Sequence, residues 1–202
     1  MVRLRQVAIW SFDLAAWGEC TQATTEQEAR SLFARRVGVA DAELEVRERI
    51  TGREGVFADD LLPAGDGQIT RTLEILDAQR AESLSLLDAS DDKALDKRDG
   101  SVKQPAWMPW RTPRKILRHI ADTESRTYPL WCALPQMEPI EDLHEELEHS
   151  AHHIREVITT MPRSFRTTHD GGVWTPVKLL RRLAWHERVE LVFLRRRLHA
   201  RR

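Results

Sequence analysis

Two stretches of this chain, residues 112–124 and 175–187, carry the same helix pattern 63 positions apart. Each begins with a Thr-Pro pair, which is typical of a helix start, because the hydroxyl caps free N–H groups and proline fits the first turn. The two stretches align without a gap. Each has a lysine, a Leu-Arg pair and a final glutamate at equivalent positions. The repeat predicts two equivalent helices that pack about an approximate two-fold axis.

Two further segments have apolar residues at helical spacing, which predicts amphipathic helices. Their stripes are Ile69, Leu73, Leu76, Leu84 and Leu87 in one, and Leu143, Leu147, Ile154 and Ile158 in the other. Together with the repeat, the sequence predicts four helices at about 66–88, 112–131, 141–160 and 175–199. Residues 66–202 are therefore expected to form a four-helix bundle, and the protein is mainly α.

The first 52 residues have a different pattern, which predicts a small α+β unit. Residues 6–12 are rich in β-branched and aromatic side chains, as a strand is. Thr25 and Glu28 form a capping box that predicts a short helix. Residues 44–50 alternate apolar and charged side chains, which predicts a half-buried second strand. Residues 53–65, rich in Gly and Asp, connect this unit to the bundle.

The charge balance and the cysteine content narrow the functional classes. The chain has 31 basic and 32 acidic residues, so no excess charge favours nucleic acid or an anionic membrane as a partner. It lacks the run of about 18 apolar residues that a membrane span needs, and its first residues lack the apolar core of a signal peptide. Cys20 and Cys132 are far apart and form no metal motif. We therefore expect a cytoplasmic protein; homo-oligomerisation stays open.

Several ionisable residues fall on the apolar sides of the predicted helices when residues are placed at about 100° intervals. Burying such groups unpaired costs several kcal/mol each, roughly. They must therefore pair with one another, bind a cation or line a wet pocket. These residues are Arg80, His119, Glu124, His186, Glu187 and Glu190.

Two arrangements of these groups are compatible with the spacing, and they can coexist. In the first, Arg80 lies between Glu124 and Glu187 in a structural network. In the second, His186 and Glu190, four residues apart on one helix side, bind a divalent metal ion with His119 as third ligand. Two histidines and one carboxylate suit zinc, nickel or iron. The Arg–Glu network would then lie behind the ligands.

A second group of histidines lies in the predicted helix 141–160, among several glutamates. These residues are His144, His149, His152 and His153. They fall away from the apolar stripe of that helix. A solvated acidic surface is the preferred interpretation, with adventitious metal binding as the alternative.

The segments TPRKILRHIADTE (112–124) and WTPVKLLRRLAWHERVEL (174–191) resemble the DinB/YfiT-like superfamily. The resemblance covers about residues 66–200 and implies an up-up-down-down four-helix bundle. It also implies a divalent metal held by one histidine of the second helix and an H-x-x-x-H motif of the last. His119 and His186 match the first two of these ligands, whereas Glu190 replaces the final histidine. Some members transfer or isomerise thiol adducts, and this departure leaves an inherited activity open.

The N-terminal unit is similar to HicB-like proteins, which often act as antitoxins. The similarity is carried by the first strand, by WGEC at 17–20 and by TTEQEA at 24–29. No DNA-binding segment is visible in it.

Two functions follow from these observations. The first is a divalent-metal-dependent enzyme, of hydrolase or thiol-transferase type, acting on a small-molecule substrate. Its catalytic residues beyond the metal ligands are unknown. The second is a non-enzymatic binding or regulatory module whose inner charges are structural and whose N-terminal unit pairs with a partner.

Overall fold

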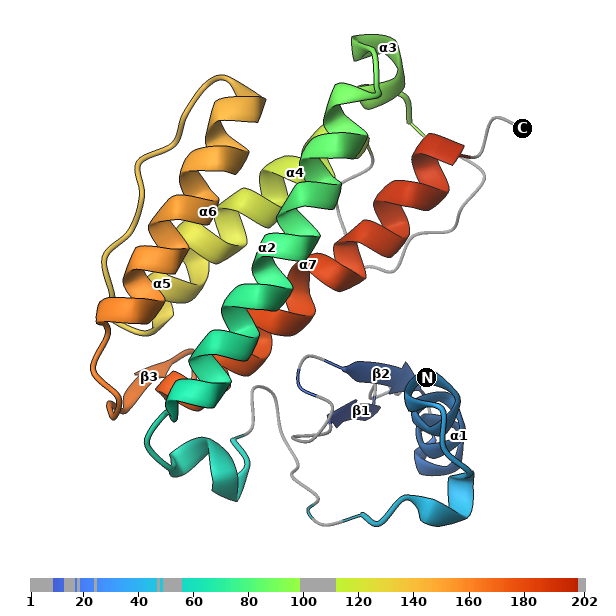
Figure 1. Ribbon diagram of the computed structural model, residues 1–202, viewed down its shortest axis with the longest axis vertical. Coiled ribbons are helices and arrows are strands. Elements are labelled where there is room, and N and C mark those ends of the chain that lie inside the picture. The colour runs from blue at the N-terminus through green and yellow to red at the C-terminus, as the bar shows by residue number, and fades with distance from the viewer. Residues whose placement is uncertain are drawn as a thin grey trace, which may run out of the picture.

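The computed structural model is mainly helical, as the sequence predicts (Figure 1). It describes residues 9–12, 17, 19–23, 25–46, 48, 56–98 and 112–199. All four predicted helices are present, and their ends agree with the prediction to within two residues. They are α2 (Asp66–Asp88), α4 (Pro113–Asp122) continued by η3 (Thr123–Thr127) and α5 (Tyr128–Trp131), α6 (Leu143–Thr160) and α7 (Pro176–His199). A short helix, α3 (Asp92–Leu95), follows α2.

The repeated Thr-Pro pattern produces the same cap at the start of α4 and of α7. The Thr112 hydroxyl accepts a hydrogen bond from the Lys115 amide at 3.3 Å. The Thr175 hydroxyl accepts one from the Lys178 amide, also at 3.3 Å. Each cap satisfies an N–H group that has no partner inside its own helix.

Helices α2 and α7 lie side by side and run in the same direction (Figure 1). The Gln79 side chain donates to the Ala184 carbonyl at 3.1 Å. One turn further along both helices, the Ser83 hydroxyl donates to Glu187 at 2.6 Å. Contacts that advance together along both chains require parallel helices.

The other two long helices run against this pair. Asp66 at the start of α2 contacts Arg163, three residues after the end of α6. Asp88 at the end of α2 contacts His144 at the start of α6. The connection 132–142 returns along the bundle, so α4–α5 and α6 are parallel to each other (Figure 1). The chain order is therefore up-down-down-up, and the expected up-up-down-down order is wrong. The reason is that the long crossover follows α5, whereas α6 and α7 are joined by a hairpin.

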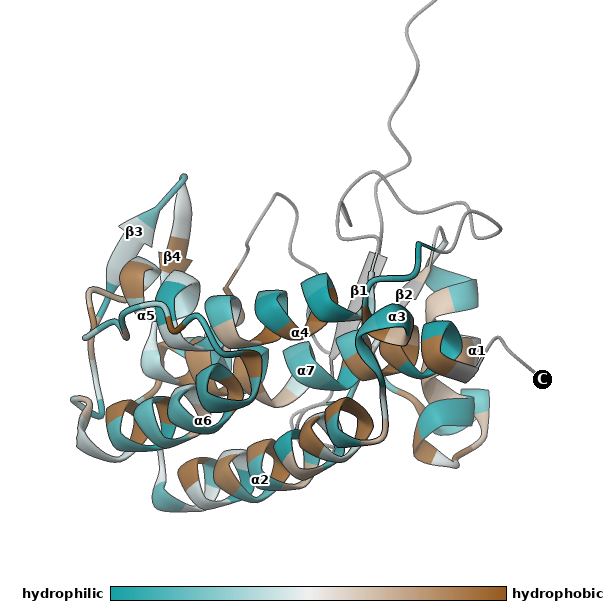
Figure 2. Ribbon diagram, turned by 90° about the horizontal axis from the view of Figure 1, so that it is seen from above, coloured by the Kyte–Doolittle hydropathy of each residue, from teal (hydrophilic) through white to brown (hydrophobic). Residues whose placement is uncertain are grey.

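The bundle interior contains two apolar clusters with a charged layer between them. Each long helix has an apolar side and a polar side (Figure 2). One cluster lies at the end of the bundle where the hairpin 167–174 joins α6 to α7, and it includes Leu76, Tyr128, Ile154, Trp174 and Leu183. The other, at the end near α3, includes Ile116, Ile120, Leu147, Leu191 and Leu194. The positions between them along the helices hold Arg80, Glu124 and Glu187, all buried.

The N-terminal unit contains strands β1 (Ile9–Phe12) and β2 (Cys20–Ala23), paired antiparallel, followed by α1 (Glu26–Val37). Thr25 caps α1 as predicted, accepting from the Glu28 amide at 3.2 Å.

The expected strand at 44–50 is wrong in its described part. The segment Asp41–Glu43 forms the short helix η1, and residues 44–46 are irregular, while residues 47, 49 and 50 lie outside the described part. The Arg30 side chain donates to the Leu44 carbonyl at 2.7 Å and to that of Asp41 at 3.0 Å. These bonds hold the segment against α1, and residues 44–46 join no strand.

Two buried contacts attach the residues before α2 to the bundle. The Trp17 indole N–H donates to the Thr72 hydroxyl at 2.7 Å, and its ring belongs to the apolar cluster at the hairpin end. Asp60, in η2 (Ala58–Leu61), forms a two-pronged ion pair with Arg181 of α7, at 2.5 and 3.1 Å. The predicted division into units 1–52, 53–65 and 66–202 stays a prediction.

A second hairpin, β3 (Thr167–His169) and β4 (Gly172–Trp174), joins α6 to α7. Within the described residues, no helix is both long and apolar enough to cross a membrane.

Candidate metal centre

A widened turn, Thr123–Thr127, interrupts the helix that carries His119. Pro129 has no backbone N–H, so it cannot bond the Ser125 carbonyl four residues earlier. That carbonyl instead accepts from the Met137 amide of the returning connection, at 3.0 Å. The Tyr128 amide bonds the carbonyl of the first residue of the turn, five positions back, which is the π-helical pattern. Such turns are frequent at functional sites.

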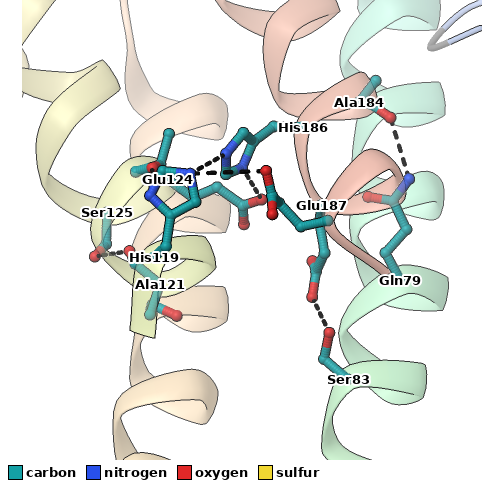
Figure 3. A network of polar contacts seen from close by, with 12 residues as sticks. Gln79, Ser83, His119, Ala121, Glu124, Ser125, Ala184, His186 and Glu187 are labelled. Carbon is teal, nitrogen blue, oxygen red and sulfur yellow. Dashed lines mark hydrogen bonds and ion pairs between the residues drawn. The ribbon is translucent and has the colours of Figure 1, made fainter. Parts of the chain in front are cut away.

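His119 and Glu124 are five residues apart, and the wide turn begins between them. The helix wheel places both on the apolar side of this helix. Both reach His186 of α7 (Figure 3).

The two imidazole rings face each other through their Nε2 atoms, which lie 3.2 Å apart. The rings are nearly perpendicular, with centroids 5.0 Å apart. Glu190 lies one turn after His186, and its Oε1 is 3.9 Å from His119 Nε2. One potential ligand atom from each of the three residues lies within 4.8 Å of the other two. The structure thus brings together the three residues that the sequence selects as metal ligands.

Burial leaves both imidazoles without charge. His186 and Glu190 are buried, whereas the His119 side chain keeps 19% of its surface exposed. Removal from water lowers the pKa of both rings to about 3, and the neighbouring His186 contributes to the shift of His119. A neutral imidazole has one unprotonated nitrogen, which is the form that binds a metal ion.

The spacing of these atoms fits a shared ion. Two metal–nitrogen bonds of about 2.0–2.1 Å at a tetrahedral angle separate the nitrogens by about 3.3 Å. The observed 3.2 Å agrees. The Glu190 Oε1 is 3.9 Å from His119 Nε2, so it would have to approach that nitrogen by roughly 0.6 Å to reach the same separation. The donor set of two nitrogens and one carboxylate oxygen suits zinc, nickel or iron.

A buried Arg–Glu network lies directly behind His186. The Glu124 carboxylate places Oε1 3.4 Å from His186 Nδ1 and accepts from Arg80 through Oε2 at 2.9 Å. The Arg80 Nε donates to Glu187 at 3.2 Å. The structure therefore places Arg80 between the two glutamates of the repeat, the arrangement that the helix wheel predicts.

The same guanidinium also bonds α6, through the Leu147 carbonyl and the Ser150 hydroxyl, the latter at 2.6 Å. It therefore links α2, to which Arg80 belongs, to the other three long helical segments. One guanidinium faces two carboxylates, and burial raises the pKa of both Glu124 and Glu187 to about 7 against the opposing effect of Arg80. Arg80, Glu124 and Glu187 together carry a net charge of −1 when both carboxyl groups are ionised.

Some polar partners were not identified from the sequence. The Thr123 hydroxyl lies 3.2 Å from His119 Nδ1, and Ser83 and Ser150 complete the network around Arg80. Thr123 follows His119 by four residues, so helical spacing could have indicated this contact. The two serines give no such signal, because small polar residues are also common on solvated surfaces.

The α6 histidines are separate from this centre. His149 and His152 are exposed, and His153 lies 3.1 Å from the Pro135 carbonyl. Among the described residues, none of the α6 histidines belongs to a three-ligand group.

Comparison with known proteins adds no assignment. No family model matches this chain, and neither a curated protein nor a solved structure matches it.

Proposed function

We propose that this chain is a DinB-like protein in which His119, His186 and Glu190 hold a divalent transition-metal ion. The observation that carries the proposal is the 3.2 Å approach of two uncharged imidazole nitrogens from different helices, His186 buried and His119 half-buried. The carboxylate of Glu190 beside them completes a three-ligand set. The DinB/YfiT-like resemblance of residues 112–124 and 174–191 assigns metal duty to His119 and His186 independently.

The proposed activity is of hydrolase or thiol-transferase type on a small molecule. A divalent ion at this position would act as a Lewis acid and lower the pKa of a coordinated water or thiol. Three protein ligands leave coordination positions open for such a group. The exposed part of His119 gives the centre access to solvent, while Glu190 and His186 lie deeper.

A zinc titration of metal-free protein tests the binding step. The wild type should take up one equivalent, and the double variant His119→Ala/His186→Ala should lose it. The control is His149→Ala/His153→Ala, which removes two histidines, four residues apart, from α6. Equal zinc affinity in the wild type and the His119/His186 variant would refute the assignment.

Activity is tested separately with the zinc, nickel and iron forms. A chromogenic ester reports hydrolysis, and a low-molecular-weight thiol with an electrophilic acceptor reports thiol transfer. Turnover by the loaded wild type that disappears in His186→Ala supports an enzyme. A protein that binds metal but turns over neither substrate class contradicts the proposed activity.

A second candidate is a non-enzymatic binding or regulatory module. The observation that favours it is the Arg80 network, which links four helical segments through protein groups alone. In that case the purified protein contains no bound transition metal, and a chelator leaves its melting temperature unchanged. A metal-loaded protein that is destabilised by chelator contradicts this candidate.

A further inference from the structure

The two histidines differ in what lies behind their Nδ1 atoms. His186 Nδ1 faces Glu124 Oε1, at 3.4 Å, and an ionised carboxylate only accepts hydrogen bonds. His119 Nδ1 faces the Thr123 hydroxyl, at 3.2 Å, and a hydroxyl both donates and accepts. Thr123 and Glu124 are adjacent in the wide turn. The first can donate to its ring or accept from it, whereas the second, when ionised, can only accept.

Glu124 is restrained in its role as acceptor. Its other oxygen receives an N–H of Arg80 at 2.9 Å, and this guanidinium is buried with it. Arginine has donors and no acceptor, so Arg80 favours the ionised carboxylate against the effect of burial, and Glu124 acts as a pure acceptor above its pKa of about 7. A neutral His186 with its proton on Nδ1 then presents an unprotonated Nε2 toward His119.

We infer that Glu124 is a positioning residue that fixes the proton of His186 on Nδ1, whereas Thr123 allows His119 to carry its proton on either nitrogen. Without an ion, His119 donates from Nε2 to Nε2 of His186, which agrees with their 3.2 Å separation. The Thr123 hydroxyl then donates to His119 Nδ1.

The second state of His119 rests on the proposed metal site. When an ion is bound, the His119 proton is on Nδ1 and is donated to the Thr123 oxygen. Both Nε2 lone pairs then face the ion. One proton changes nitrogen by exchange with solvent, to which His119 is partly exposed, and none is gained or lost. His186 therefore keeps the same tautomer with and without the ion, whereas His119 changes its tautomer when the ion binds.

The internal repeat supplies a matched control for Glu124. Glu187 is its counterpart 63 positions later, is equally buried and contacts the same Arg80. Its hydrogen bonds are to Arg80 and to Ser83, whereas Glu124 bonds Arg80 and His186. Replacing either glutamate by glutamine removes one buried carboxylate from Arg80, but only Glu124→Gln changes the partner of the His186 ring.

Nitrogen-15 NMR of the histidine rings tests the inference in metal-free protein at a pH above about 8, where both rings are neutral and the Glu124 carboxyl group is ionised. The wild type should show His186 protonated on Nδ1 and His119 protonated on Nε2, with signals assigned by their loss in His186→Ala and His119→Ala. Glu124→Gln should give His186 as a mixture of tautomers, because an amide can donate as well as accept. Glu187→Gln should leave the tautomer unchanged.

Zinc titration of the same proteins measures how these contacts affect the tautomers and the zinc affinity. Zinc addition should move the His119 proton to Nδ1 and leave His186 unchanged. Glu124→Gln should weaken zinc affinity about 10- to 100-fold, the usual effect of losing a partner of a ligating histidine. Thr123→Val should weaken it less, and Glu187→Gln least of all.

The outcomes separate the inference from the proposed function. Metal-free wild type with His186 protonated on Nε2 overturns the inference, and this measurement needs no variant to fold. A Glu124→Gln spectrum identical to that of the wild type overturns it as well. The predicted tautomers without any zinc binding would support the role of Glu124 and refute the metal site.

Discussion

Replacing Arg80 by leucine should destabilise the metal-free protein by about 3–5 kcal/mol, the usual cost of removing one partner from a buried ion pair. Arg80 is 5% exposed and bonds Glu124, Glu187, Ser150 and a backbone carbonyl of α6. Leucine occupies similar apolar space but leaves both carboxyl groups without their cation. Proton uptake by these carboxyl groups limits the loss, since their pKa values are already raised to about 7.

Urea unfolding in the presence of a chelator, followed by circular dichroism, measures this loss without a contribution from bound metal. The control is Arg155→Leu, which breaks an exposed ion pair with Asp77 between α6 and α2. That pair is 43% and 62% exposed, so its loss should cost less than about 1 kcal/mol.

A compensated variant tests the electrostatic cause. Adding Glu124→Gln and Glu187→Gln to Arg80→Leu removes the stranded carboxylates and should restore part of the lost stability. An Arg80→Leu protein as stable as the Arg155→Leu control would refute the burial of this network. A compensated variant less stable than Arg80→Leu itself would refute the charge argument.

Four further substitutions have stability losses of expected size. Trp17→Ala should cost about 3–5 kcal/mol and expose the N-terminal unit to limited proteolysis, because the ring packs in the bundle core; equal protease resistance would contradict this docking. Asp60→Ala should cost about 3–5 kcal/mol in urea unfolding by stranding buried Arg181, and a loss below that of Arg155→Leu would contradict its burial. Thr112→Ala and Thr175→Ala should each cost about 1 kcal/mol by thermal unfolding, and clearly unequal losses would contradict the equivalence of the two caps.

The helix positions could be predicted because the signals for them are local. The Thr-Pro pairs at 112 and 175 mark two helix starts through a hydroxyl and a fixed φ angle. The apolar spacing of 66–88 and 141–160 marks two more helices. These features depend on neighbours within a few residues, so no knowledge of the fold is needed.

The packing order and the N-terminal sheet depend on contacts between distant segments. An apolar stripe shows which side of a helix is buried but not the direction of its neighbour, so the up-down-down-up order was not predicted. The pairing of β2 with β1 was missed for a related reason. The segment Cys20–Ala23 has few β-branched or aromatic residues, whereas the alternating residues 44–46 are held by Arg30 instead.

The candidate site was predictable to the extent that it follows from helical spacing. His186 and Glu190 share a helix side by their spacing of four, and the repeat relates α4 to α7. The widened turn was not predicted, although Pro129 within the expected helix 112–131 was its signal. The turn begins just before Glu124, which contacts His186.

A crystal structure of zinc-loaded protein, with anomalous diffraction at the zinc edge, tests the metal assignment most directly. We predict one strong peak about 2.0–2.2 Å from Nε2 of His119, Nε2 of His186 and a carboxylate oxygen of Glu190. A crystal in which these three side chains keep their positions while zinc binds only at the α6 histidines would contradict it.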